Sequence, residues 1–83
     1  MEQNQLLSLL PIGVQGVVTE IYTAGDLRRR FIELGFAPGN TVIPVFSDPT
    51  AHIRAYAVSN SVIALRRKDA KEIIVSVKEE INP

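Results

Sequence analysis

Leu34-Gly35-Phe36-Ala37-Pro38-Gly39 is the stretch of this 83-residue sequence that decides how the chain folds. Glycine at position 35 predicts a helix end, because a residue without a Cβ readily adopts the left-handed conformation that closes a helix C-terminus. Pro38-Gly39 predicts a type II turn, in which proline fixes the first φ and glycine tolerates a positive second φ. The stretch therefore predicts a helix that ends and turns directly into a β-strand.

The helix before this corner is predicted from an apolar face. Leu27, Phe31 and Leu34 recur at spacings of four and three residues, which places them on one side of a helix. Asp26 is the expected N-cap. We expect these three side chains and Phe36 to lie in the core.

Short strands are predicted on both sides of the helix. Alternating, β-branched segments predict strands over residues 16–22, 41–46, 52–58, 61–65 and 73–77, and single helical turns are expected at 6–10 and 68–71. Pro44 cannot donate a ladder hydrogen bond, so an edge position or a bulge is expected there. This order predicts a mainly β fold, a small, partly open β-barrel of about five strands with the helix inserted after the first strand.

The composition indicates one small globular domain. Hydrophobic residues make up 46% of the chain and charged residues 22%, unlike a disordered sequence. Nine basic and nine acidic residues give a net charge of +0, so bulk charge does not argue for nucleic acid. The absence of cysteine excludes disulfides and thiol nucleophiles. Without a signal peptide or a membrane span, we expect a cytoplasmic single domain over residues 1–83, with its core at 7–77 and flexible ends at 1–5 and 78–83.

Four elements in this order resemble one protein family. They are Leu10-Pro11-x-Gly13, Arg30-Phe31-x-x-Leu34-Gly35-Phe36-x-Pro38-Gly39, Asp48-Pro49, and Ile63-Ala64-Leu65-Arg66 followed by Ala70 and Ile73-x-Val75. In these residues the chain resembles the ferrous iron transport protein A (FeoA) family. The resemblance implies an SH3-like barrel. Many relatives have glycine where this chain has Asn60, which tolerates the same left-handed backbone.

The resemblance implies a partner rather than a reaction. Members of the family are associated with the membrane protein of bacterial ferrous iron uptake, which carries a cytosolic GTPase domain. We expect a non-catalytic cytosolic accessory protein that binds this region, with no cofactor, no nucleic acid and no insertion into the membrane. A homo-oligomer stays open. The alternatives are a small nucleic-acid-binding barrel and a transition-metal-sensing module like the C-terminal domain of metal-dependent repressors.

Two basic clusters are the candidate partner-binding residues. One cluster is Arg28, Arg29 and Arg30 on the helix, and the other is Arg66 and Arg67, followed by Lys68, at a strand end. These side chains either dock an acidic surface of a partner or are simply solvated. An i,i+4 pair with Asp26 would give Arg30 a structural role as well.

The remaining candidates have mainly structural interpretations. His52 is the one histidine, but iron(II) sites combine histidine with carboxylates or cysteines, so a solvent-facing strand residue is preferred and no metal site is expected. The backbone turns are assigned to Gly13, Gly35, Pro38, Gly39 and Asn60.

Two apolar sets leave an alternative open. The first set is aromatic: Tyr22, Phe46 and Tyr56. These side chains either line a groove, as in barrels that bind proline-rich peptides, or lie in the core, and we prefer the core. The leucines of residues 6–10 are too many for one helical turn to bury, so some are expected to face a partner or a second copy.

Overall fold

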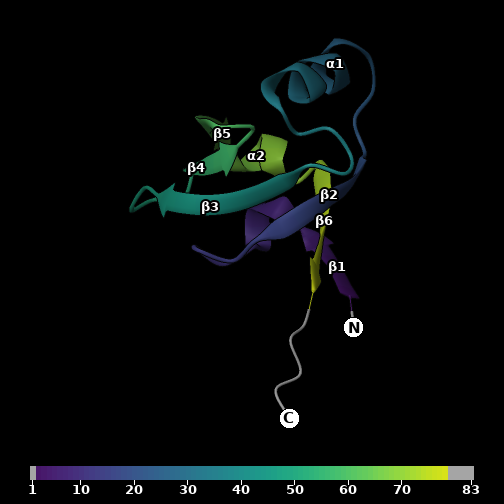
Figure 1. The fold of residues 1–83 in the computed structure, drawn as a ribbon. Coiled ribbons are helices and arrows are strands. Elements are labelled where there is room, and N and C mark those ends of the chain that lie inside the picture. The colour runs from purple at the N-terminus through teal and green to yellow at the C-terminus, as the bar shows by residue number, and fades with distance from the viewer. Residues whose placement is uncertain (1, 79–83) are drawn as a thin grey trace.

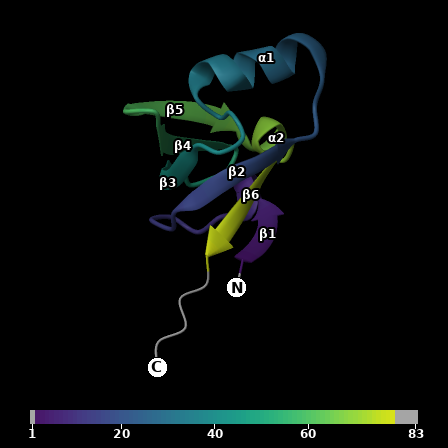
Figure 2. The same ribbon diagram turned by 45° about the vertical axis from the view of Figure 1, so that its right-hand side comes forward.

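A strongly bent antiparallel sheet forms most of the molecule in the computed structural model, which describes residues 2–78 (Figure 1). Six strands pair in the order β1-β6-β2-β3-β4-β5. Their bounds are β1 Glu2–Leu6, β2 Gly16–Ile21, β3 Thr41–Ser47, β4 Ile53–Val58, β5 Ser61–Arg66 and β6 Ile73–Lys78. Figures 1 and 2 show the β1-β6-β2 half running across the β3-β4-β5 half. Within residues 2–78, β1 and β5 stay unpaired edges, so the predicted mainly β, partly open barrel is confirmed.

The sixth strand comes from residues expected to be a flexible end. β1 pairs with β6 from Glu2 opposite Lys78 to Leu6 opposite Ile74. The expectation of flexible ends is therefore corrected for residues 2–5 and for Lys78, while the rest of the expected C-terminal end, residues 79–83, lies outside the described residues. Because β1 precedes the strand expected first, the helix α1 (Gly25–Leu34) follows the second strand.

The corner between α1 and β3 contains two residues with a left-handed backbone. Gly35 ends α1 with a φ of 114°. Gly39 has a φ of 98°, and the N–H of Asn40 donates to the carbonyl of Ala37 at 3.0 Å, as a type II turn requires. A Cβ at Gly35 would lie 2.7 Å from Oγ of Ser59. The corner therefore packs closely against the β4–β5 turn, and position 35 has no room for a side chain.

Two bulges decide which strand residues face the core. The register between β2 and β6 shifts between Val18 and Glu20, so Val18 and Ile21 are both buried and strict alternation along this strand is wrong. The register between β3 and β4 shifts between Pro44 and Phe46. A bulge accommodates the proline, because it has no N–H to give to the ladder.

The core lies inside the bend of the sheet and under α1. The ring of Phe36 meets the ring of Tyr56 edge to face, with centroids 6.1 Å apart. The buried apolar side chains are Leu7, Leu10, Val18, Ile21, Phe31, Phe36, Val42, Tyr56, Val58, Leu65, Ala70, Ile73 and Val75. These side chains come from both halves of the sheet and pack into one continuous core.

Several apolar side chains lie elsewhere than expected. Leu34 is half-buried and packs against the core, whereas Leu27 is exposed. Tyr22 and Phe46 are also exposed, so the preference for burial is correct for Tyr56 and wrong for these two. The expected N-terminal turn is the 3-10 helix η1 (Leu7–Leu9), which buries Leu7 and leaves Leu9 at the surface.

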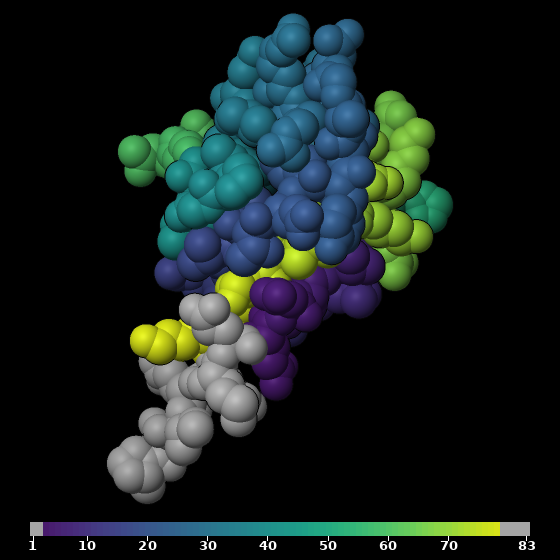
Figure 3. All heavy atoms as spheres, turned by 90° about the vertical axis from the view of Figure 1, so that its right-hand side faces the viewer, coloured from purple at the N-terminus to yellow at the C-terminus, as the bar shows by residue number. Residues whose placement is uncertain are grey.

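The helix α1 lies at one end of the molecule, whereas α2 (Arg67–Ala70) lies beside the sheet (Figures 1 and 2). Figure 3 shows α1 as a lobe at the end opposite β1, and α2 follows β5 directly. Within residues 2–78, the longest helices fall short of the length and apolar character needed to cross a membrane.

Candidate partner-binding surface

A basic pocket forms where β5 runs into α2. It is lined by His52, Ile53, Arg66, Arg67, Lys68 and Lys71 and has a volume of about 610 Å³. The N–H of Arg67 donates to the carbonyl of His52 at 2.8 Å, which ties the start of α2 to the turn before β4. One turn of α2 then brings Lys71 into the lining. The pocket therefore joins the predicted cluster of Arg66, Arg67 and Lys68 with three residues that sequence reasoning did not connect to it, His52, Ile53 and Lys71.

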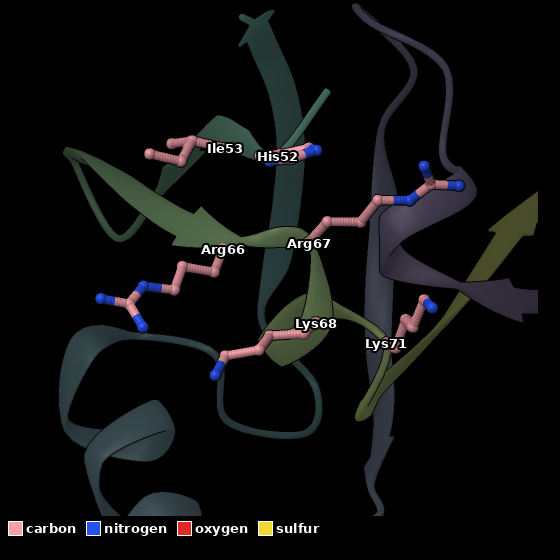
Figure 4. A pocket seen from close by; sticks show the side chains of 6 residues that line it. All are labelled: His52, Ile53, Arg66, Arg67, Lys68 and Lys71. Atoms are coloured by element: carbon pink, nitrogen blue, oxygen red, sulfur yellow. The ribbon is translucent and has the colours of Figure 1, made fainter. Parts of the chain in front are cut away.

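The charge of the basic pocket is unpaired in the described part of the chain. Its lining holds four of the nine lysines and arginines. The ion pair found within residues 2–78 joins Arg29 to Asp26 elsewhere on the surface. Figure 4 shows Arg66 and Lys68 pointing to one side and Arg67 and Lys71 to the other. This broad spread suits an extended acidic partner better than a single small anion.

The predicted helix cluster divides into different roles. Arg28 is half-buried, and its Nη1 donates to the carbonyl of Ile21 at 3.1 Å, which links α1 to the end of β2. Nη1 of Arg29 lies 3.8 Å from Oδ1 of Asp26. This ion pair is exposed, with i,i+3 spacing, and contributes little to stability. Arg30 is exposed, and its expected pair with Asp26 is replaced by the Arg29 pair. Asp26 itself lies in the first turn of α1 rather than at the N-cap, which is Ala24.

His52 is exposed in the turn between β3 and β4, one residue before the strand in which it was expected. Oδ1 of Asp48 accepts hydrogen bonds from the backbone N–H of His52 at 3.0 Å and from Oγ1 of Thr50 at 3.1 Å. Although desolvation acts in the opposite direction, these hydrogen bonds hold the pKa of Asp48 below its ordinary value. Within residues 2–78 there is no group of three or more histidines and carboxylates that could hold a metal ion.

Arg54 is the structurally important residue that sequence reasoning missed. It is 8% exposed, on the inner face of β4. Its Nη1 donates to the carbonyl of Ser8 at 3.0 Å and its Nη2 to that of Leu10 at 2.8 Å. The guanidinium carbon lies 5.7 Å from the centroid of the Tyr56 ring, within cation–π range. Arg54 therefore links η1 and the residue after it to β4.

The family model and the curated relative point to the same family. The model of the FeoA domain matches residues 5–77. A curated relative from Porphyromonas gingivalis, an Fe(2+) transport protein A/Fe(2+) transporter FeoB fusion protein, is 34% identical over 71 residues. This match covers 86% of the present chain and spans 8% of the fusion protein.

Solved structures show the same fold. Iron(II) transport protein A from Clostridium thermocellum has a TM-score of 0.84 and 29% identity, over 88% of this chain and 45% of that one. FeoA from Stenotrophomonas maltophilia, solved complexed with zinc and described as a prokaryotic SH3 domain protein, has a TM-score of 0.75 and 31% identity, over 86% and 88% of the two chains. The predicted SH3-like fold is confirmed.

Proposed function

Because this chain belongs to the FeoA family, we propose that it is a non-catalytic accessory protein of ferrous iron uptake. In this proposal it binds the cytosolic GTPase region of the membrane iron transporter and modulates transport, and it works in the cytoplasm because that region lies there. The Porphyromonas gingivalis relative carries the proposal, since it joins a segment 34% identical to this chain and a FeoB transporter in one polypeptide. Fusion raises the effective concentration of one domain at the other, which is useful where the two act together.

The distribution of charge supports a binding role. Four cations face solvent around the basic pocket, with no carboxylate among residues 2–78 close enough to pair with them. Exposed unpaired cations speed and orient the approach of an acidic partner. We propose the basic pocket as the main contact, with Arg29 and Arg30 of α1 as a second one.

The proposal is tested by the uptake of radiolabelled ferrous iron in cells that lack this protein. We expect the initial rate of uptake to change on deletion and to return when the intact gene is restored. The transporter level is measured in parallel, so that a change in rate is not a change in abundance. An unchanged rate, together with failure of the transporter's cytosolic region to co-purify with the protein in any nucleotide state, contradicts the proposal.

A further inference from the structure

The outward surface of β3, β4 and β5 is apolar. Directly opposed residues of antiparallel strands share one face of a sheet. Ala57 lies between Ile43 and Val62, and the next outward position, Ala55, lies between two further apolar residues. We call this set the outer face: Ile43, Phe46, Ala55, Ala57, Val62 and Ala64.

The outer face is open to solvent, unlike the opposite face of the same strands. Phe46 is 61% exposed and Val62 is 64% exposed, whereas Tyr56 and Val58, which point the other way from β4, are buried. The central alanines make a shallow floor between the larger side chains, and a hollow of about 490 Å³ lies over Ala57 beside the β4–β5 turn. A contiguous exposed apolar patch on a small protein is typical of an interaction site.

The outer face continues into the basic pocket. The next outward pair along β4 and β5 is Ile53 opposite Arg66. Both residues line the basic pocket, and Ile53 is 46% exposed. One continuous surface therefore runs from apolar at the β4–β5 turn to cationic at α2.

We infer that the outer face and the basic pocket together dock a segment of a protein partner that carries apolar side chains followed by carboxylates. The apolar part of the segment covers the alanine floor, and its carboxylates meet Arg66 and the other cations of the pocket. The inference rests on the proposed function for the partner's identity, the transporter's cytosolic region, and on the strand register for the contact itself.

The charge pattern favours this occupant over a second copy of the chain. In a two-fold dimer each copy offers the same patch to the other, and no residue of the outer face or the pocket lining is a carboxylate. Cations buried in such a dimer would lack partners, which is costly. Single-stranded nucleic acid is bound through aromatic stacking, and Phe46 is the only aromatic residue of the outer face.

The first arm of the test uses the full chain and a synthetic peptide of leucines followed by glutamates. Backbone amide shifts are recorded by NMR during titration, and the control peptide has lysines in place of the glutamates. We expect the shifts to cluster on β3, β4, β5 and α2, with affinity at least about tenfold higher for the acidic peptide. Shifts that leave these elements untouched overturn the inference.

The second arm uses the purified cytosolic region of the transporter and four variants. Val62→Glu changes the outer face and Arg66→Glu the pocket. Their matched controls are Tyr22→Glu, a residue 62% exposed just after β2, and Lys78→Glu at the end of β6. We expect the first two to weaken binding about tenfold or more and the controls to stay within about twofold.

The outcomes separate the inference from the proposed function. If the cytosolic region binds and all four variants bind alike, the docking surface is wrong and the proposed function stands. If the region does not bind while the acidic peptide still maps to the outer face, the proposed function is wrong and the docking surface stands. A wild-type dimer that Val62→Glu converts to a monomer, or an oligonucleotide that shifts the outer face as strongly as the acidic peptide, overturns the inference.

Discussion

Replacing Arg54 with methionine is expected to destabilise the fold by about 3 kcal/mol, because each of the two short hydrogen bonds from a charged donor contributes about 1.5–3 kcal/mol. These bonds, at 3.0 Å to Ser8 and 2.8 Å to Leu10, are the ones lost. The contact with the carbonyl of Leu7 is 3.5 Å long and is not counted. Methionine carries no charge, so the substitution also removes the desolvation cost of the buried guanidinium, and this offsets part of the loss. The expected net destabilisation therefore lies at the lower end of the summed hydrogen-bond contributions.

The assay is urea unfolding followed by circular dichroism. For a domain with a urea m-value of about 1.5 kcal/mol/M, a loss of this size lowers the unfolding midpoint by about 2 M at unchanged m. Arg66→Met is the matched control, because Arg66 is exposed and its replacement is expected to cost less than about 0.5 kcal/mol. Arg54→Lys should fall between the two, since an ammonium lacks the planar fork that reaches two carbonyls. A cost below about 1 kcal/mol for Arg54→Met would refute the structural role assigned to this residue.

Three further predictions concern the corner, the core and the partner. Gly35→Ala should lower the free energy of unfolding by about 2–3 kcal/mol, because the added Cβ would lie 2.7 Å from Oγ of Ser59. Gly39→Ala should lower it by only about 1 kcal/mol, because a Cβ there would meet nothing within 4 Å. Both are measured by thermal unfolding, and equal costs would count against the close packing at Gly35. Burial raises the pKa of Tyr56 above its ordinary value of 10.0, so above that pH the unfolded chain loses a proton that the folded chain keeps and stability falls as pH rises. Tyr56→Phe should remove this alkaline loss while Tyr22→Phe keeps it, and identical pH profiles would contradict the assignment. Affinity for the transporter's cytosolic region should fall as salt rises from low to physiological concentration, and salt-independent binding would exclude the basic pocket as the contact.

Turn geometry could be predicted from sequence because its causes are local. Gly35 and Gly39 adopt positive φ for reasons that lie within a few residues of each. β1 could not be predicted this way, since its polar residues show no strand pattern and its pairing is supplied by the backbone of β6, far away in the sequence. The strand exists because a partner edge is available.

The inner and outer faces of β4 could not be told apart from sequence. Ile53, Ala55 and Ala57 alternate with Arg54, Tyr56 and Val58, and an arginine usually marks the solvent side. Here the arginine points inward, because the carbonyls of Ser8 in η1 and of Leu10 just after it accept hydrogen bonds from its guanidinium.

The candidate site was only partly visible for a related reason. Arg66 and Arg67 are neighbours in the chain, so their cluster shows in the sequence. His52 and Lys71 join them through one backbone hydrogen bond and one turn of α2. The apolar character of the outer face depends on the register of three strands, which a single strand's pattern does not contain.

The most direct measurement is calorimetric titration of the transporter's cytosolic region into this protein, without nucleotide, with GDP and with GTP. We expect saturable binding in at least one of these states, weakened about tenfold or more by Arg66→Glu. Absence of saturable binding in every state would contradict an accessory role that acts through direct contact with the transporter.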